Sequence, residues 1–313
     1  MFAFFGKPAR ASFRSRLRTA PVGAVAAGRL RFRKMVGERT RSLYQRFLPE
    51  HSRRAFVWKY AQAVGGRRPR HFHAEPEINL LIRGSATFGV GAQTTTVSEG
   101  ELLAFPPGQD HVLISGSPDL FLYAIGLNAA YAADVLSGEQ GTIVPLHVRL
   151  GAADLAVVTR QASDIVDRAG VDQLGAELWS RVHWLSARSA PQTRPAPHVL
   201  TRRALRSLAG APELGLEGLA QTLRAHPTDI SRYFHRDVGV TLVRYRTRLR
   251  LLHVIELVDS GRYDLMEAAS AAGFGSYSQC HRSFQSELGC APRGFFAPDL
   301  RQSMQLAYEP CGN

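Results

Sequence analysis

Hydrophobic and polar positions follow two different patterns, one on either side of residue 128. Between residues 55 and 127, short apolar runs of strand type alternate with turns rich in Gly and Pro. The runs are Ile78–Ile82, Ala86–Val90, Thr94–Val97, Leu102–Phe105, His111–Ile114 and Leu120–Ile125. Short strands at such regular spacing predict a small antiparallel β-barrel or sandwich.

Helical spacing replaces strand spacing in residues 128–188. Apolar residues recur every three or four positions in Ala129–Leu136, Ala152–Arg168 and Leu174–Leu185. In the last of these runs the apolar face consists of Leu174, Leu178, Val182 and Leu185. These stripes are too narrow to form a core alone, so we expect the helices to pack on the barrel or on a second copy of the chain. A homodimer formed through this segment is therefore predicted.

Residues 189–197 are polar, rich in Pro and free of acidic residues, which indicates a linker. From residue 198 to about 298 the pattern is helical and contains two related motifs. In Leu216–Val240 an apolar-spaced helix is followed by a break at Arg224–His226 and a second helix opened by Pro227. Leu265–Ala291 repeats this order, with Ser276 as the expected cap of its second helix. Both patterns indicate helix-turn-helix motifs.

The segment between the motifs, Thr241–Ser260, predicts one long helix. Its apolar stripe consists of Leu242, Tyr245, Leu249, Leu252 and Ile255. We expect four arginines on the other faces of this helix: Arg244, Arg246, Arg248 and Arg250.

The two motifs and the long helix resemble the DNA-binding domain of the AraC/XylS-type family of transcription regulators. The second motif is the more specific, because the family's spacing is matched by Gly273-Phe274, Ser278, Arg282, Phe284, Gly289 and Pro292. The first motif departs from the pattern, with Arg224 where a turn Gly is usual and His226 where a Ser cap is usual. An Arg tolerates positive φ poorly, so the conformation of this turn is left open.

The resemblance implies that the second helix of each motif enters the major groove of double-stranded DNA. The outward positions are Thr228, Ser231 and Arg232 in the first motif, and Ser276, Tyr277, Gln279 and Arg282 in the second. Arg suits a bidentate contact with guanine and Gln one with adenine. For any one of these side chains, a solvated helix face without base contact is the alternative.

The strand region contains the sequence HFHAEPEINLLIRG, followed later by His111. These pieces are similar to the two motifs of the cupin superfamily, whose small barrels often hold a divalent metal on three His and one Glu. The corresponding residues are His71, His73, Glu77 and His111, a donor set that suits Fe, Mn, Ni, Cu or Zn. His71 and His73 share a face if they lie on a strand, and Glu77 joins them if the strand stays regular past Pro76. The alternative, which we favour here, is a metal-free pocket for an organic effector.

Charge changes the picture less than its size suggests. The formal net charge is +13, but residues 1–54 hold 14 of the 39 Lys and Arg and only two of the 26 acids. The basic leader, residues 1–37, is interpreted as a start-site artefact with translation from Met35; a transit peptide or a disordered arm are the alternatives. Three cysteines without CxxC spacing indicate a reducing compartment, and no apolar segment is long enough to span a bilayer, so a cytoplasmic location is predicted.

The predicted fold class is therefore α+β. A cupin-like antiparallel β-barrel is followed by helices and then by an all-α domain with two helix-turn-helix motifs. The predicted function is a DNA-binding transcription regulator without catalytic residues, which responds to a small-molecule effector in the barrel and admits RNA polymerase as a further partner. The alternative is a metal-dependent cupin enzyme, a dioxygenase or isomerase, fused to a DNA-binding domain. An architectural or RNA-binding protein is disfavoured, because non-specific binding needs charge rather than two shaped helices. The effector, the operator and the direction of regulation are not given by the sequence.

Overall fold

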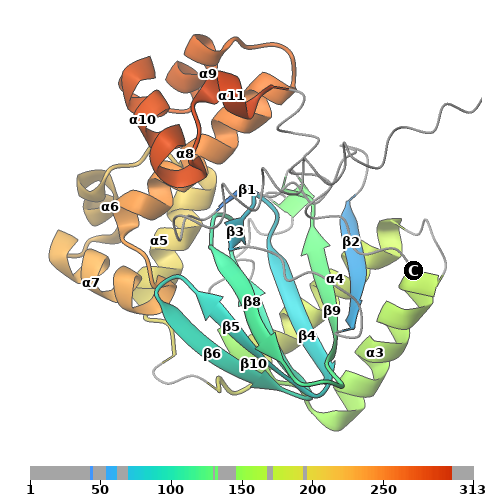
Figure 1. Ribbon diagram of the computed structural model, residues 1–313. Coiled ribbons are helices and arrows are strands. Elements are labelled where there is room, and N and C mark those ends of the chain that lie inside the picture. Colours follow the sequence, from blue (N-terminus) through green and yellow to red (C-terminus); the bar gives the residue numbers. More distant parts are fainter. Residues whose placement is uncertain are drawn as a thin grey trace, which may run out of the picture.

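The computed structural model describes residues 43–44, 54–61, 70–129, 131–132, 146–167, 172–192 and 196–297. They form an N-terminal β domain, two helices packed against it, and a C-terminal all-helical domain (Figure 1). This is the predicted α+β fold. The basic leader, parts of the 128–188 segment and the middle of the linker lie outside the described residues. Among the described helices, none has the length and apolar content needed to cross a bilayer.

The β domain consists of two five-stranded sheets. The first has the order β1-β3-β8-β5-β6, with bounds β1 Leu43–Tyr44, β3 His71–Phe72, β8 His111–Gly116, β5 Ser85–Val90 and β6 Gln93–Ser98. The second has the order β10-β7-β4-β9-β2, with bounds β10 Leu146–Arg149, β7 Glu101–Phe105, β4 Glu77–Arg83, β9 Phe121–Leu127 and β2 Ala55–Ala61. All neighbours are antiparallel except β1 and β3. The six predicted runs correspond to β4–β9.

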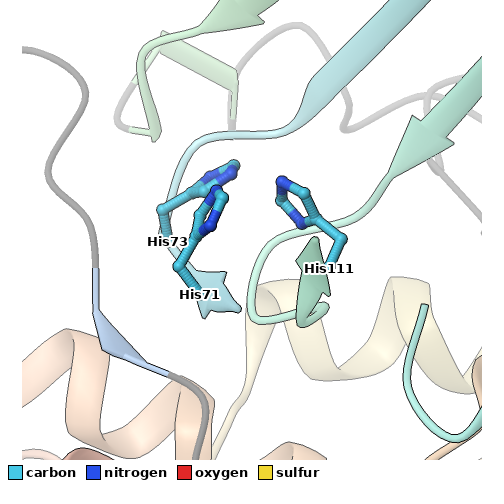
Figure 2. Close-up of side chains that lie close together, drawn as sticks. All are labelled: His71, His73 and His111. Atoms are coloured by element: carbon cyan, nitrogen blue, oxygen red, sulfur yellow. The ribbon is translucent and has the colours of Figure 1, made fainter. Parts of the chain in front are cut away.

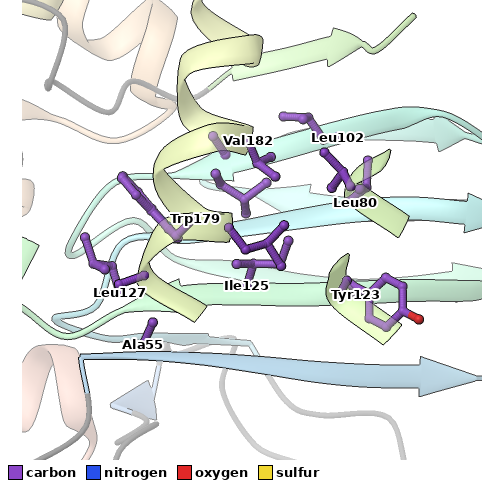
Figure 3. Close-up of a cluster of buried hydrophobic side chains, with 14 of the residues drawn as sticks. Ala55, Leu80, Leu102, Tyr123, Ile125, Leu127, Trp179 and Val182 are labelled. Carbon is purple, nitrogen blue, oxygen red and sulfur yellow. The ribbon is translucent and has the colours of Figure 1, made fainter. Parts of the chain in front are cut away.

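Alternation along the strands builds a core on each face of the second sheet. Between the two sheets lie Leu81, Phe88, Leu103, Phe105 and Leu122, all buried. The outer face is covered by helices α3 (Ala152–Asp167) and α4 (Asp172–Arg188). Figure 3 shows Trp179 and Val182 of α4 over the strand residues Leu80, Leu102, Ile125 and Leu127. The expectation that these helices pack on the barrel is confirmed.

Two expectations for this region are wrong. Leu174, predicted on the inward stripe of α4, is 44% exposed. Strand β10, at residues 146–149, lies inside the segment expected to be helical and pairs with β7. Its four residues are too few to show a period, and its partner strand defines it more than its own sequence does.

The C-terminal domain is built around one long helix. Its bounds are α5 Val199–Gly210, α6 Leu216–Leu223, α7 Pro227–Val238, α8 Leu242–Asp259, α9 Leu265–Ala271, α10 Tyr277–Leu288 and α11 Pro292–Phe295. Helix α8 contributes Leu242 and Tyr245 to the core of the first motif, and Leu251 and Ile255 to that of the second. The motifs are thus joined by a shared rigid element.

The caps explain where the helices begin. Thr241 and Ser276 each accept a hydrogen bond from a backbone N–H of the first turn, as expected of N-caps. His226 does the same through Nδ1, which lies 3.3 Å from the Thr228 nitrogen. Arg224 ends α6 with φ of 50°, in the left-handed region. The turn therefore keeps its geometry without the usual Gly, at a strain of about 1–2 kcal/mol.

Arg248 is a further correction. It was expected on an outer face of α8, but it is fully buried between the two domains. Its guanidinium group forms ion pairs with Asp110 of the β domain and Glu287 of α10. A buried Arg is tolerated when it is paired. The period of one helix could not reveal partners in another domain.

Candidate functional site

The first candidate DNA-reading surface is the outer face of α7. Thr228 and Arg232 are exposed and Ser231 is half-buried. The Arg232 Nη2 atom lies 2.8 Å from Asp229 Oδ1, and its guanidinium group lies over the Tyr233 ring at 4.8 Å. An exposed pair of this kind contributes little to stability, so the guanidinium group can exchange Asp229 for a DNA base or phosphate.

The second surface is the outer face of α10, where Ser276, Gln279 and Arg282 are exposed and Tyr277 is half-buried. Ser276 Oγ accepts a hydrogen bond from the Gln279 N–H, and Gln279 Oε1 accepts one from the Gly275 N–H at 3.0 Å. Within the described part of the chain, Arg282 makes no hydrogen bond or ion pair. Of these side chains, Arg282 is therefore the most available for a base.

The β domain contains a buried cluster of three histidines. His71 on β3 and His111 on β8 are directly paired across the two strands, and His73 follows the end of β3. Figure 2 shows the three rings facing one another. Each ring offers one nitrogen, and the three nitrogens lie within 4.8 Å of one another. All three side chains are buried, at 2–4% exposed.

Glu77 completes this group from the other sheet. Strand β3 ends at Phe72, so the chain does not continue as one regular strand past Pro76; it crosses to the second sheet, where Glu77 opens β4. Glu77 Oε2 nevertheless lies 3.0 Å from His73 Nε2 and 3.7 Å from His111 Nε2. We call His71, His73, His111 and Glu77 the histidine cluster.

Backbone carbonyls orient two of the imidazoles. His73 Nδ1 lies 2.6 Å from the Glu75 oxygen, and His111 Nδ1 lies 3.1 Å from the Gln109 oxygen. A carbonyl oxygen can only accept, so both Nδ1 atoms carry the proton and both Nε2 lone pairs face Glu77. Asn79 was not predicted as a site residue; it donates to Glu77 Oε1 at 2.6 Å and orients the carboxylate. Its signal in the sequence is a polar residue two positions from Glu77 on the same face of an apolar strand.

The cluster brings unpartnered polar atoms together. Burial would raise the pKa of Glu77, but hydrogen bonds from His111 and His73 lower it well below its usual range. For His73, burial outweighs the carboxylate and lowers the pKa. His73 Nε2 and Glu77 Oε2 are both buried, and an imidazole lone pair facing a carboxylate oxygen needs a cation between them. Three imidazole nitrogens and one carboxylate, each oriented by a second group, fit a divalent transition metal.

An open groove lies elsewhere on the β domain, between the second sheet and α3. Its lining includes Lys59, Phe121, Tyr123, Leu155 and Arg160. Sites for small molecules are usually enclosed and combine apolar walls with convergent polar groups. The groove is open to solvent, whereas the histidine cluster is buried and convergent. The cluster is therefore the better candidate for a ligand site.

The chain matches known proteins in two blocks. Residues 37–182 match the family described as "AraC-like ligand binding domain", and residues 219–297 match that described as "Helix-turn-helix domain". The HTH-type transcriptional activator RhaS of Salmonella schwarzengrund (strain CVM19633) is 25% identical over 255 residues, covering 75% of this chain and 87% of the relative. RhaS of Salmonella typhi matches with the same identity and coverage.

A solved structure is also similar. ToxT from Vibrio cholerae O395 covers 79% of this chain and 97% of its own length, at 12% identity and a TM-score of 0.43. A score this low carries no argument, so the assignment rests on the sequence families. The first family takes in the β domain with its histidine cluster, and the second takes in the helices with both candidate reading surfaces. The chain belongs to the AraC family and is a DNA-binding transcription regulator with an N-terminal ligand-binding domain.

Proposed function

We propose that this regulator reads its operator with two helices, α7 and α10, and that the histidine cluster is its ligand site. The reading residues are Thr228, Ser231 and Arg232 on α7, and Ser276, Tyr277, Gln279 and Arg282 on α10. The observation that carries the DNA-reading part is the exposure of Arg232 and Arg282 on the second helix of each motif. An Arg in this position can form two hydrogen bonds with one guanine.

The test is selection of bound DNA from a random library with the full chain. We expect two blocks of specified bases, about 10 base pairs apart, because the two helices enter successive turns of one major groove. The variants Arg232→Ala and Arg282→Ala are selected in parallel, and each is expected to relax the block read by its own helix. Enrichment without any base preference would contradict the proposal.

A divalent transition metal is the occupant that the donor set of the cluster supports best. The sequence favoured an organic effector, and that alternative is an outcome of the same test. With the Nδ1 atoms held by carbonyls, the free lone pairs of His73 and His111 converge on Glu77 Oε2. An organic molecule needs room between these side chains, whereas an ion needs only the donors. When bound, the ion would supply a fixed positive charge to Glu77 and the three imidazoles.

The occupant is tested by metal analysis of the purified protein and by thermal unfolding with and without a chelator. We expect bound metal and a lower Tm after chelation, because an ion that binds only the folded state stabilises it. His73→Ala is expected to remove both the metal and the chelator effect. A metal-free protein whose Tm rises with an organic molecule from a metabolite library would support the organic effector instead.

The remaining features of the proposal rest on the family. The RhaS relatives are named activators, so we propose that this protein activates transcription and that it contacts RNA polymerase. We keep the domain boundaries 55–127, 128–188, 189–197 and 198–298, a homodimer and a cytoplasmic site of action as parts of the proposal. The family is one of regulators, and we propose no catalytic activity; a turnover screen of the metal-loaded protein tests the dioxygenase and isomerase alternative.

A further inference from the structure

The histidine cluster lies one residue away from the interface between the two domains. Along β3, His71 and His73 point into the cluster, while Phe72 between them points the other way. Phe72 is fully buried and packs in the core of the second helix-turn-helix motif, with Leu251, Leu252 and Phe284. A residue of the β domain thus completes a core of the DNA-binding domain. Alternation along one short strand places the ligand site and the docking site back to back.

The same relationship holds on the neighbouring strand. Asp110 directly precedes His111, and its Oδ1 atom lies 2.6 Å from the Arg248 Nη1 atom of α8. Its other oxygen lies 3.0 Å from Arg70 Nη1, and its carbonyl accepts a hydrogen bond from the Gly91 N–H. Arg248 also places Nε 2.9 Å from Glu287 Oε2 on α10. A continuous path of bonds therefore runs from His111 through Asp110 and Arg248 to the second reading helix.

The loop before Asp110 adds contacts to the same face of α8. Tyr245 Oη donates to the Pro107 oxygen at 2.6 Å, and Arg248 Nη1 donates to the Gly108 oxygen at 3.4 Å. Gly108 has φ of +76°, and a Cβ atom there would lie 3.2 Å from Leu249 Cδ2. The close approach of loop and helix thus depends on a glycine.

We propose that ligand binding at the histidine cluster and docking of the DNA-binding domain on the β domain are one coupled equilibrium, transmitted by Phe72 and Asp110. This inference rests on the proposed ligand site and specifies how that site acts. A bound cation fixes the ends of β3 and β8 in the arrangement that buries Phe72 and pairs Asp110 with Arg248. Without it, four buried polar side chains need water, and the strand ends that carry the docking residues lose their fixed position. The ligand therefore favours the docked arrangement.

Thermodynamic reciprocity supplies the test: if ligand binding stabilises docking, then weakening docking must weaken ligand binding by the same factor. Arg248→Met and Tyr245→Phe alter contacts from the α8 side and change no residue of the cluster. The control is Arg250→Met on the same helix, whose Nη2 atom bonds only within its own domain, to the Glu213 oxygen at 2.8 Å. Zn²⁺ affinity of the full chain is measured by competition with a chelating dye, and circular dichroism checks that each variant is folded.

We expect Arg248→Met to weaken Zn²⁺ binding roughly 5- to 150-fold, the usual range of coupling between sites. Tyr245→Phe should weaken it less but in the same direction, and it keeps the test open if Arg248→Met fails to fold. Arg250→Met should leave it unchanged. Folded Arg248→Met and Tyr245→Phe variants that bind Zn²⁺ as tightly as the wild type would overturn the coupling alone. A wild-type chain that does not bind Zn²⁺ would overturn the metal site, and the coupling with it.

Discussion

Arg248 of the long helix and Asp110 of the β domain, 138 residues apart in the chain, form a buried ion pair of 2.6 Å. Burial would raise the pKa of Asp110, but Arg248 and Arg70 outweigh that effect and hold the pKa below its usual range. A buried pair is weak evidence for net stability, yet removing one partner leaves an uncompensated charge. The pair therefore acts as a specific fastening between the ligand-binding domain and the DNA-binding domain.

Arg282→Ala should weaken operator binding by about 1–3 kcal/mol and relax base choice at one position. The side chain is exposed on α10 and has no partner within the described residues, so the loss reflects a contact with DNA. Fluorescence anisotropy on the selected operator measures the change. Arg262→Ala, in the loop after α8, serves as the control for a lost positive charge. Equal affinity of Arg282→Ala and the wild type would show that α10 does not read bases.

Arg224→Gly should stabilise the protein by about 0.5–1 kcal/mol. Glycine removes the left-handed strain at φ of 50°, and part of this gain is offset by the greater entropy of glycine in the unfolded chain. Urea unfolding measures the difference. The matched control is Gln221→Gly inside α6, which should destabilise by about 1 kcal/mol. A destabilised Arg224→Gly variant would mean that the arginine makes a contact worth more than its strain.

Glu101 should contribute to an acid-sensitive part of the stability. Burial raises its pKa, but the Ser98 N–H, His147 and Arg149 together lower it below the ordinary 4.5. A lowered folded pKa gives stability that is present above the unfolded value and is lost as the pH falls through the folded value. Unfolding free energies measured from pH 6 downward should therefore fall less steeply below about pH 4.5 in Glu101→Gln than in the wild type. The exposed Glu256→Gln variant should follow the wild-type curve, and identical curves for all three proteins would contradict the assignment.

Trp184→Glu should weaken self-association. Trp184 and Leu174 on α4 are 47% and 44% exposed, and Val157 on α3 is 39% exposed, which leaves apolar area uncovered by the β domain. A charged residue in a buried apolar interface is costly to desolvate. Sedimentation of the full chain measures the dimer, with Lys59→Glu in the open groove as a control for the added charge. A wild-type chain that is monomeric at tens of micromolar would refute the predicted dimer.

The sequence carried most of the fold because the strands and helices have strong local periods. The six apolar runs and the long helix at Thr241–Ser260 could be located from spacing and caps alone. Short elements such as β3 and β10 could not, because two or four residues have no period and depend on their partner strands. His71, His73, Glu77 and His111 could be named from their types and similarity to a motif. Their approach within one group required the crossing between sheets that no local pattern shows.

The interface between the domains was not predictable from the sequence. Phe72 reads as one more apolar residue in a strand, and Arg248 as one of four arginines on a helix. Their burial results from contacts over more than a hundred positions, which leave no trace in hydrophobic spacing. The sequence therefore predicted both functional sites without showing how they are connected.

The central claim is that occupation of the histidine cluster controls DNA binding. Its most direct test is the affinity of the full chain for its selected operator, measured with Zn²⁺ and after chelation, in the wild type and in folded His73→Ala. We predict that the wild-type Kd changes at least about fivefold between the two conditions, the lower limit of ordinary coupling between sites, and that the His73→Ala value does not change. A wild-type Kd that is the same with the site loaded and stripped would contradict the claim.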